Sequence, residues 1–311
     1  MIVLRENCFP PAGQVVATIG FFDGVHCGHR FLLSQTEDTA RRRGGKSMAV
    51  TFSRHPSEVL CPGTFKELLT DFDERCSLLG EAGIDYCAIL DFTLALSKMS
   101  AKDFMSEYLR RRLNVSVLVV GYDHSFGHDK ESTFDDYRKT GEQVGIEVIK
   151  AGQFVPPDGL KISSTQIRRQ LHAGNVETAA LMLGRRYALC GTVVDGRRVG
   201  RRIGFPTANI SMAGSQKVIP AAGVYSAVAH VGENAYASVV NIGTRPTLHN
   251  GNDTTIEAHL IGFDGDIYGR VLELEFVGRL RDERRFDSLD ELREQINRDA
   301  AAVVDILKNK A

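Results

Sequence analysis

The stretch VVATIGFFDGVHCGHRFLL, residues 15–33, decides how the first half of this chain folds. It opens with an apolar run of strand length, 15–22, and a glycine-containing turn then leads into apolar residues at helical spacing. We expect a helix that begins near Val25 and runs towards Arg43. A buried strand that passes through a tight turn into a helix is the opening unit of an alternating α/β domain.

The same rhythm continues up to about residue 150. Its later elements are predicted strands at 47–53, 86–92 and 115–123 and predicted helices at 73–83 and 100–113. Near-continuous apolar strands separated by helices favour a parallel sheet covered on both faces. Ligands of such sheets bind at the carboxyl ends of the strands, so we expect the turn at 20–29 and the segment GYDHSFG, 121–127, at that edge.

From about residue 185 the pattern changes to β-type runs without intervening helices. These runs lie at 187–196, 223–231, 235–243, 256–263 and 271–280. They predict an antiparallel barrel or sandwich. A helix closes the chain, because Ser288 and Glu291 form a capping-box pattern ahead of apolar residues at helical spacing. The helical stretch 175–186 is the expected junction between the two domains.

Composition excludes several classes of protein. The chain has 311 residues, a net charge of −1, 43% hydrophobic and 25% charged residues, which gives no global case for a nucleic-acid or membrane-surface protein. No window approaches the roughly 18 apolar residues of a membrane span. Six cysteines are scattered without a CxxC pair, which favours reduced thiols in a cytoplasmic protein.

Two histidines begin the first predicted helix. Backbone N–H groups at a helix start are unsatisfied and favour anions, and the imidazoles of His26 and His29 would add donors there. With no third ligand of suitable spacing, this arrangement suits the phosphates of a nucleotide better than a metal. The alternative is a pair of solvated histidines, which would be preferred for an isolated HxxH; the glycines, Asp23 and the strand-to-helix context favour the phosphate site.

A second polar segment, GRRVGRRIGFPTANI (196–210), is too rich in glycine and charge for a helix. Glycines allow a backbone to approach phosphate closely. Thr207 and Asn209 alternate, so on an extended chain both side chains point to one face. Their oxygens are hard donors suited to Mg²⁺. The alternative is a turn region with a solvated arginine cluster.

Two signatures in the first half resemble a known superfamily. GFFDGVHCGH, 20–29, looks like the HxGH signature of the nucleotidylyltransferases, and ISSTQIRRQL, 162–171, resembles their second signature, ISSTxIR. These enzymes attack the α-phosphate of a nucleoside triphosphate and release pyrophosphate. The paired hydroxyls and the guanidinium of the second signature suit phosphate binding at a helix start.

The second half resembles a riboflavin kinase domain. The motifs GRRIGFPTAN, GVY, NIGTRPT, IEAHLIGFDGDIYG and LRDERRFDSLDELREQI occur in the order of that family. The chain as a whole is therefore similar to the prokaryotic bifunctional riboflavin kinase/FAD synthetase family. The resemblance implies a Rossmann-like FMN adenylyltransferase domain, 1–182, followed by a riboflavin kinase domain, 183–311, with a six-stranded antiparallel β-barrel and a C-terminal helix. Such an enzyme makes FMN from riboflavin and ATP, and then FAD from FMN and ATP.

The resemblance also assigns residues. Glu257 matches the general base of the kinase, His26, His29 and Arg168 match catalytic positions of the adenylyltransferase, and Thr207 and Asn209 match the ligands of Mg²⁺. Nucleotide binding is implied for Gly20, Phe22, Asp23, His26, His29, Ser163, Ser164, Thr165, Arg168, Gly204, Pro206, Thr207 and Asn209. Flavin binding is implied for Asp123, Ser125, Phe126, Arg281 and Phe286.

The sequence departs from the family at two positions. Cys27 stands where Arg or Leu is commoner, and Ser125 stands where Arg is common, which bears on the tightness of the adenylyltransferase site. The alternatives are a monofunctional riboflavin kinase with an inactive first domain, and a regulator that binds flavin or nucleotide without turnover. The expected partners are small-molecule substrates, with neither nucleic acid nor membrane, and a homo-oligomer is left open.

Overall fold

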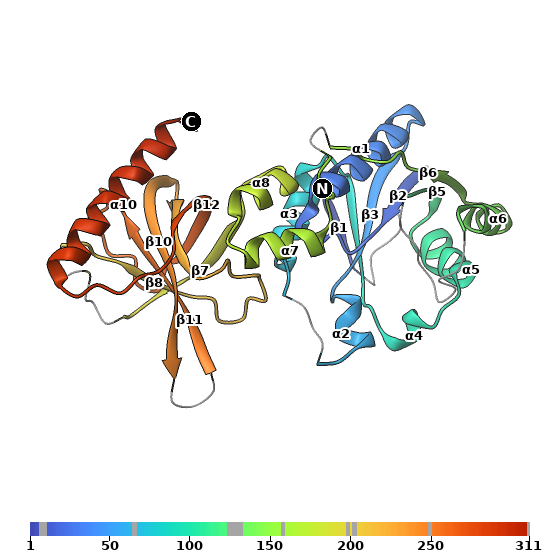
Figure 1. Cartoon of the computed structure of the whole chain (residues 1–311). Helices are drawn as coiled ribbons and strands as arrows, with labels where there is room; N and C mark the ends of the chain where they lie inside the picture. The colour runs from blue at the N-terminus through green and yellow to red at the C-terminus, as the bar shows by residue number, and fades with distance from the viewer. Residues whose placement is uncertain are drawn as a thin grey trace. The chain divides into compact units, whose positions relative to one another are not determined.

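The computed structural model describes residues 1–5, 11–63, 67–122, 133–156, 159–196, 200, 204–247 and 251–309. The chain divides into two compact units, Met1–Ser164 and Thr165–Ala311, which are considered one at a time (Figure 1). No helix in the described part of the chain is both long and apolar enough to cross a membrane.

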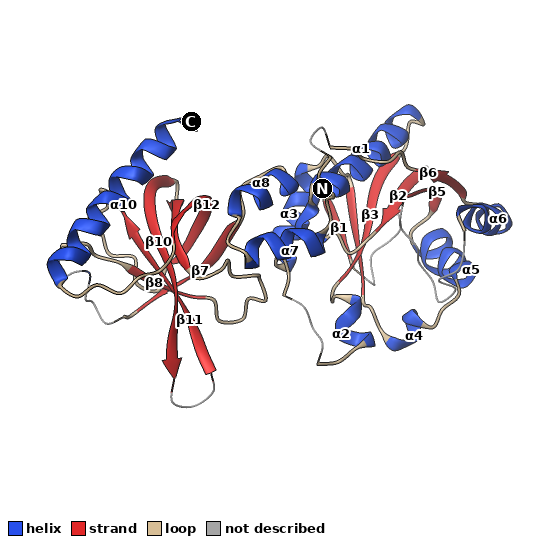
Figure 2. Cartoon of the chain, viewed as in Figure 1, coloured by secondary structure: helices blue, strands red, loops and turns tan. Residues whose placement is uncertain are grey.

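Within the described ranges of the first unit, six strands form one parallel sheet in the order β1-β4-β3-β2-β5-β6 (Figure 2). The strands are β1 (Ile2–Leu4), β2 (Val15–Ile19), β3 (Lys46–Phe52), β4 (Tyr86–Leu90), β5 (Val115–Val120) and β6 (Glu147–Lys150). The predicted parallel sheet is confirmed, and β1 and β6 are additional edge strands. Because the chain builds outward from β2 in both directions, the strand order reverses at β2, and this is where an open α/β sheet binds ligands.

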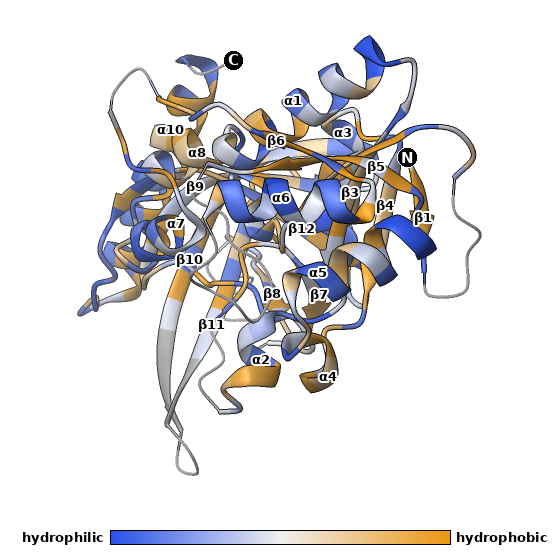
Figure 3. Ribbon diagram, turned by 90° about the vertical axis from the view of Figure 1, so that its right-hand side faces the viewer, coloured by the Kyte–Doolittle hydropathy of each residue, from blue (hydrophilic) through white to orange (hydrophobic). Residues whose placement is uncertain are grey.

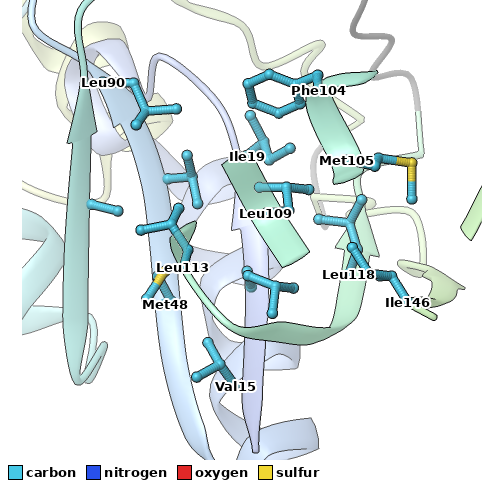
Figure 4. Close-up of a cluster of buried hydrophobic side chains, with 14 of the residues drawn as sticks. Val15, Ile19, Met48, Leu90, Phe104, Met105, Leu109, Leu113, Leu118 and Ile146 are labelled. Carbon is cyan, nitrogen blue, oxygen red and sulfur yellow. The ribbon is translucent and has the colours of Figure 1, made fainter. Parts of the chain in front are cut away.

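Helices cover both faces of this sheet. They are α1 (Cys27–Arg42), α2 (Pro56–Leu60), α3 (Phe72–Glu81), α4 (Leu94–Ser97), α5 (Ala101–Phe104), its π-wound continuation η2 (Met105–Arg112) and α6 (Phe134–Val144). Leu33 of α1 and Leu79 of α3 pack with Cys87 on one face. On the other face, Met105 and Leu109 pack against Met48 (Figure 4). In Figure 3, the central strand β5 is coloured mainly as hydrophobic and the outer helix α6 mainly as hydrophilic.

The turn after β2 corrects two predicted boundaries. The strand ends at Ile19 rather than at residue 22, and the helix begins at Cys27 rather than near Val25, because a 3₁₀ turn, η1 (Asp23–Val25), lies between them. Phe22 has a φ of 57° and Val25 a φ of 38°. Both side chains are nearly inaccessible, at 2% and 0% exposure, so apolar burial offsets the strain of this rare backbone conformation.

The described strands of the second unit close into a six-stranded antiparallel barrel in the order β10-β11-β8-β7-β12-β9. They are β7 (Ala188–Val194), β8 (Ala208–Ser211), β9 (Gly223–Val231), β10 (Asn234–Thr247), β11 (Gly251–Leu260) and β12 (Val271–Arg281). The barrel predicted from the resemblance is confirmed. The short β8 begins at Ala208, directly after Thr207, and contains Asn209, so the predicted binding segment enters the barrel wall directly.

Among the described residues, the helices α7 (Ser164–His172), which begins at the unit boundary, α8 (Val176–Leu183) and α10 (Leu289–Asn309) accompany the barrel. Glu177 of α8 accepts a hydrogen bond from the backbone N–H of Arg279 at 3.2 Å. The predicted junction helix therefore packs on the barrel and belongs to the second unit. Ser288 accepts a hydrogen bond from the N–H of Glu291 at 3.2 Å, which confirms the predicted cap of α10.

Candidate active sites

In the first unit, Asp23 fixes the turn at the carboxyl end of β2. Its Oδ1 accepts hydrogen bonds from the backbone N–H groups of Leu69 at 2.9 Å and Thr70 at 3.2 Å. The N–H of Gly24 donates to the Thr70 hydroxyl at 3.1 Å. Asp23 is only 3% exposed. The segment before α3 and the turn after β2 are thus held together by one buried carboxylate, whose negative charge is stabilised by these donors.

The two histidines of the HxGH motif lie at the start of α1. His26 is the N-cap, and its Nδ1 accepts a hydrogen bond from the N–H of His29 at 3.2 Å. The two rings stack at 3.6 Å between centroids. Because Nδ1 accepts, we assign the proton of a neutral His26 ring to Nε2, which makes that nitrogen a donor. An imidazole donor beside unsatisfied helix N–H groups is well suited to an anion.

The ISSTQIRR segment reaches this turn through its second serine. The Ser164 hydroxyl donates a hydrogen bond to the backbone carbonyl of Asp23 at 2.9 Å. Ser163 and Ser164 belong to the first unit, whereas Thr165 and Arg168 lie in the second, where Arg168 is buried at 9% exposure. The two sequence signatures predicted to act together are therefore joined by a direct side-chain contact.

A buried cation supports the same edge of the sheet. The guanidinium of Arg75 lies 4.0 Å from the ring centroid of Phe21 and donates to the carbonyl of Phe52 at 2.7 Å. Phe21 also meets the ring of His55 edge-on at 4.6 Å. Burial lowers the pKa of Arg75, because desolvation penalises its charge. Sequence reasoning missed Arg75, since no local signal places a residue of α3 beneath a loop that lies fifty positions earlier.

The second unit has a pocket of about 250 Å³ between the outer face of the barrel and α10. Its lining residues are Gly200, Phe205, Thr207, Val224, Val239, Asn241, Glu257, His259, Arg281, Glu283, Arg284, Phe286, Leu292, Ile296 and Asp299. Glu257 of β11 pairs in register with Asn209 of β8 on one side and with Asn241 of β10 on the other. Residues paired directly across antiparallel strands point to the same face, so a carboxylate and two amides are aligned along this wall.

Two glycines that precede β8 in the chain lie close to the side chains of Thr207 and Asn209. A Cβ on Gly196 would collide with the side-chain amide of Asn209, and a Cβ on Gly200 would collide with the carbonyl of Phe205 and lie 3.2 Å from the Thr207 hydroxyl. Gly200 also accepts a hydrogen bond from the N–H of Phe205 at 2.8 Å. Gly196 and Gly200 therefore lie close to both predicted metal ligands, because neither position carries a side chain.

An ion pair closes the opposite side of the pocket. Arg281 donates to Asp299 of α10 at 2.8 Å and 3.2 Å, and Gln295 donates to the same carboxylate at 2.7 Å. The Asp299 side chain is 6% exposed, so its charge is held in a low-dielectric environment by these donors. Arg284 lies 4.6 Å above the ring of Phe286. The predicted flavin residues Arg281 and Phe286 are thus gathered in the pocket that contains Glu257.

Three of the predicted flavin-binding residues cannot be placed in either site: Asp123, Ser125 and Phe126 lie outside the described residues. The carbonyl of Pro206 lies 2.9 Å from Nδ1 of His259, which positions that ring at the pocket. Sequence reasoning missed His259, Asn241 and Glu283. The position of His259 could have been predicted from the sequence, because His259 lies two residues after Glu257 on a strand and so shares its face.

Both halves of the chain match described families. Residues 10–166 match a family described as FAD synthetase, and residues 183–307 match a family described as riboflavin kinase. Curated relatives named bifunctional riboflavin kinase/FMN adenylyltransferase include one from Escherichia coli strain K12, 38% identical over 93% of this chain and 91% of the relative. Another from Pseudomonas fluorescens is 37% identical over 96% and 94%, and one from Bacillus subtilis is 32% identical over 94% and 93%.

A solved structure is similar over both units. The crystal structure of a Streptococcus pneumoniae protein described as a macrolide-efflux protein is 30% identical and has a TM-score of 0.90. The match covers 97% of this chain and 99% of that one. The parallel-sheet unit and the barrel unit therefore occur together, in this order, in another polypeptide.

Proposed function

The chain belongs to the family of bifunctional riboflavin kinase/FMN adenylyltransferase enzymes, and from this premise we propose which residues carry each reaction. The enzyme phosphorylates riboflavin to FMN with ATP, and it transfers the adenylyl group of a second ATP to FMN, which gives FAD and pyrophosphate. Kinase chemistry is assigned to the barrel pocket and adenylyl transfer to the carboxyl edge of the parallel sheet.

In the kinase reaction, Glu257 is the general base. Its carboxylate accepts the proton of the ribityl 5′-hydroxyl as that oxygen attacks the γ-phosphorus of ATP and ADP leaves. A base within hydrogen-bond reach contributes roughly 10²- to 10⁴-fold to the rate. Arg281 and Phe286 bind the flavin ring on the side of the pocket towards α10. What supports these roles is that Glu257, Arg281 and Phe286 line one pocket.

Thr207 and Asn209 are the proposed ligands of Mg²⁺, with Gly204 and Pro206 shaping the nucleotide side. No group of three or more His, Cys, Asp or Glu side chains in the described residues could hold a metal ion. A hydroxyl and an amide oxygen fit Mg²⁺, which is commonly bound by few protein groups together with substrate phosphates. When bound, the ion neutralises charge on the transferred phosphoryl group.

In the adenylyl transfer, the FMN phosphate oxygen attacks the α-phosphorus of ATP and pyrophosphate leaves. FMN is already anionic, so the protein needs to align it and to stabilise charge rather than to remove a proton. We assign this task to His26, His29, Ser164, Thr165 and Arg168. Gly20, Phe22, Asp23 and Ser163 form the nucleotide side, and Asp123, Ser125 and Phe126 the flavin side.

The observation that carries this assignment is that the HxGH turn and the barrel pocket belong to different units, although Thr165 and Arg168 of the adenylyl-transfer set lie just beyond the boundary. The HxGH turn is built within the first unit, whereas Glu257, Thr207 and Asn241 share a pocket of the second. The two reactions should therefore be separable by single substitutions. We propose the catalytic boundary at 182/183, near the start of the matched riboflavin kinase segment, and a cytoplasmic location. The compact units divide earlier, and α8 packs on β12, where Glu177 accepts a hydrogen bond from the N–H of Arg279.

The test measures the two half-reactions of the full-length enzyme one at a time. With riboflavin, ATP and Mg²⁺, Glu257→Gln should lower kcat of FMN formation by about 10²- to 10⁴-fold, because the base is lost while the shape of the pocket is kept. With FMN supplied, the same variant should form FAD at the wild-type rate. Glu273→Gln removes an exposed carboxylate of β12 and serves as the matched control.

The complementary variant is His29→Asn, which should form FMN normally and lose FAD formation. A loss of both reactions in either variant, with an unchanged melting profile, would overturn the division of roles. Wild-type rates for Glu257→Gln in FMN formation would remove this residue as the base.

A further inference from the structure

His259 lies opposite the proposed metal ligand Thr207 on the wall of the barrel pocket. β8 and β11 are antiparallel, and their pairing ends with Ala208 opposite Ala258. Continuing the same register by one step brings Thr207 opposite His259. Because alternate residues of a strand share a face, His259 lies on the same face of β11 as Glu257, and both line the pocket together with Thr207.

At this step a side chain takes over from the ladder of backbone hydrogen bonds. The carbonyl of Pro206 lies 2.9 Å from Nδ1 of His259. A carbonyl oxygen can only accept a hydrogen bond, so we assign the proton to Nδ1, which donates it. The imidazole therefore holds the peptide group that joins Pro206 to Thr207.

The backbone of His259 is itself held from the other side of β11. His259 pairs in register with Val239 of β10, and its carbonyl accepts a hydrogen bond from the Ser238 hydroxyl at 3.1 Å. The imidazole thus projects from a strand that is paired with β10 as well as with β8. A donor on such a strand is a fixed point against which the residues before β8 can be positioned.

Residues 204–206 need an external contact of this kind because glycine makes their backbone permissive. Gly204 has a φ of 87°, a conformation that glycine adopts without steric cost. The Phe205 ring meets the His259 ring edge-on at 5.4 Å between centroids. His259 therefore contacts these residues in two ways, through a hydrogen bond and through ring packing, and substitution can separate the two.

We propose that His259 is a positioning residue of the kinase reaction: its Nδ1–H holds the Pro206 carbonyl and so keeps the adjacent Thr207 hydroxyl in place for Mg²⁺. The inference rests on the proposed role of Thr207 as a metal ligand and adds the residue that orients it. Residues that hold metal ligands from outside typically contribute about 10- to 100-fold to metal affinity. Riboflavin binding should not change, because Arg281 and Phe286 are left intact.

Three substitutions separate the hydrogen bond from the ring packing. His259→Phe keeps a ring against Phe205 and removes the donor, whereas His259→Asn removes the ring and can place an amide N–H at the position of Nδ1. Because the hydrogen bond carries the effect, His259→Phe should weaken Mg²⁺-dependent nucleotide binding by about 10- to 100-fold, and His259→Asn should retain most of the binding. His259→Gln, whose amide nitrogen reaches the position of Nε2, should resemble His259→Phe. A role of the ring in packing alone predicts the opposite order for Phe and Asn.

Binding is measured by calorimetric titration of the full-length enzyme with ADP, the nucleotide product of the kinase reaction alone. The titration is done once with Mg²⁺ and once with EDTA. His259→Phe should bind ADP more weakly than the wild type with Mg²⁺ and equally well in EDTA. In the activity assay, the Mg²⁺ concentration that gives half-maximal FMN formation should rise by the same factor, whereas KM for riboflavin and the rate of FAD formation from supplied FMN should be unchanged.

Two further variants serve as the control and as the test of the premise. His230→Phe makes the same exchange on β9, outside the lining of the pocket, and should change none of these quantities. Thr207→Val should itself weaken Mg²⁺-dependent ADP binding, and adding His259→Phe to it should cause no further loss, because the ligand that His259 positions is already absent.

The outcomes distinguish this inference from the proposed function. Weaker Mg²⁺-dependent binding in Thr207→Val but not in His259→Phe would overturn the inference and leave the metal role of Thr207 standing. Unchanged binding in Thr207→Val would remove Thr207 as a ligand and the inference with it. Equal losses with Mg²⁺ and with EDTA, or binding by His259→Asn as weak as that of His259→Phe, would also overturn the inference. His259→Gln keeps a polar side chain at this position, so the test remains decisive if His259→Phe destabilises the barrel.

Discussion

Gly196 and Gly200 shape the barrel pocket without contributing a side chain to it. They leave room for the Asn209 amide and the Thr207 hydroxyl, the proposed metal ligands. A glycine needed for close approach can be recognised from sequence only as a candidate, because the colliding atom belongs to a residue that folding brings nearby. Here the glycine spacing indicated a special segment, and the structure identifies the side chains that lie against Gly196 and Gly200.

Gly196→Ala should therefore impair riboflavin phosphorylation. The added methyl group would displace the Asn209 side chain, so we expect kcat of FMN formation to fall by about 10²-fold, as for other misplaced positioning groups. FAD formation from supplied FMN should be unaffected. Gly152→Ala is the matched control, because a Cβ there would lie 3.6 Å or more from its neighbours. Equal FMN rates for the two variants would contradict the role given to the loop.

Asp23 and His26 show how far sequence reasoning reaches at this scale. Their position at a strand-to-helix turn was predictable, and so was an anion site at the helix start. The partners of Asp23 were not, since Leu69 and Thr70 lie more than forty residues away. Nor did the pattern indicate that His26 itself caps α1, because histidine is not among the preferred N-cap residues.

At the scale of elements, an ion pair between Arg281 of β12 and Asp299 of α10 holds the C-terminal helix against the barrel. Asp299→Ala would leave the Arg281 guanidinium in the pocket without its carboxylate, which typically costs about 3–5 kcal/mol. Calorimetry should show a lower melting temperature for the barrel unit, and KM for riboflavin should rise. Asp305→Ala, an exposed position of α10, should change neither quantity. An unchanged melting profile for Asp299→Ala would show that the pair does not hold the helix.

The beginnings of β3 and β4 are joined by Asp85. Burial alone would raise the pKa of this carboxyl, but hydrogen bonds from the N–H and hydroxyl of Ser47 and from Lys46 outweigh it and hold the pKa below its usual range. A carboxylate with a lowered pKa stabilises the fold above the ordinary aspartate value of about 3.9, and this contribution disappears as the pH falls through the lowered value.

Asp85→Asn should therefore cost stability mainly at neutral pH. Because the side chain is 35% exposed, solvent screening limits the expected loss to about 1 kcal/mol. Urea unfolding of the first unit at pH 7 and at low pH measures the difference, which should shrink as Asp85 of the wild type becomes protonated. A loss that is the same at both pH values would mean that the charge of Asp85 contributes nothing.

The strands of the two sheets were predictable where long apolar runs marked them. The edge strands β1 and β6 were not, because β1 is three residues long with Ile2 57% exposed, and β6 buries Val148 but little else. The π-type winding of η2 also left no signal, since Met105 and Leu109 have the same helical spacing in either winding. Tertiary packing decides these features.

At the scale of the whole molecule, the change from alternating elements to consecutive strands predicted two domains. The exact compact units were not predictable, because α7 and α8 are helical like the first half and yet belong to the second unit, where Glu177 of α8 contacts Arg279 of the barrel. Two chemistries on two units also imply that FMN is a product of one site and a substrate of the other.

Mixing two variants, each deficient in one of the two reactions, tests the division into two sites most directly. Glu257→Gln and His29→Asn are each incubated with riboflavin, ATP and Mg²⁺, first separately and then together, and the flavins are separated over time. Separately, the first variant should convert riboflavin at least about 10²-fold more slowly than the wild type, and the second should stop at FMN. Together they should form FAD, because FMN from one protein reaches the intact adenylyltransferase site of the other. FAD formation by either variant alone at the wild-type rate, or none in the mixture, would contradict the assignment of two separate sites.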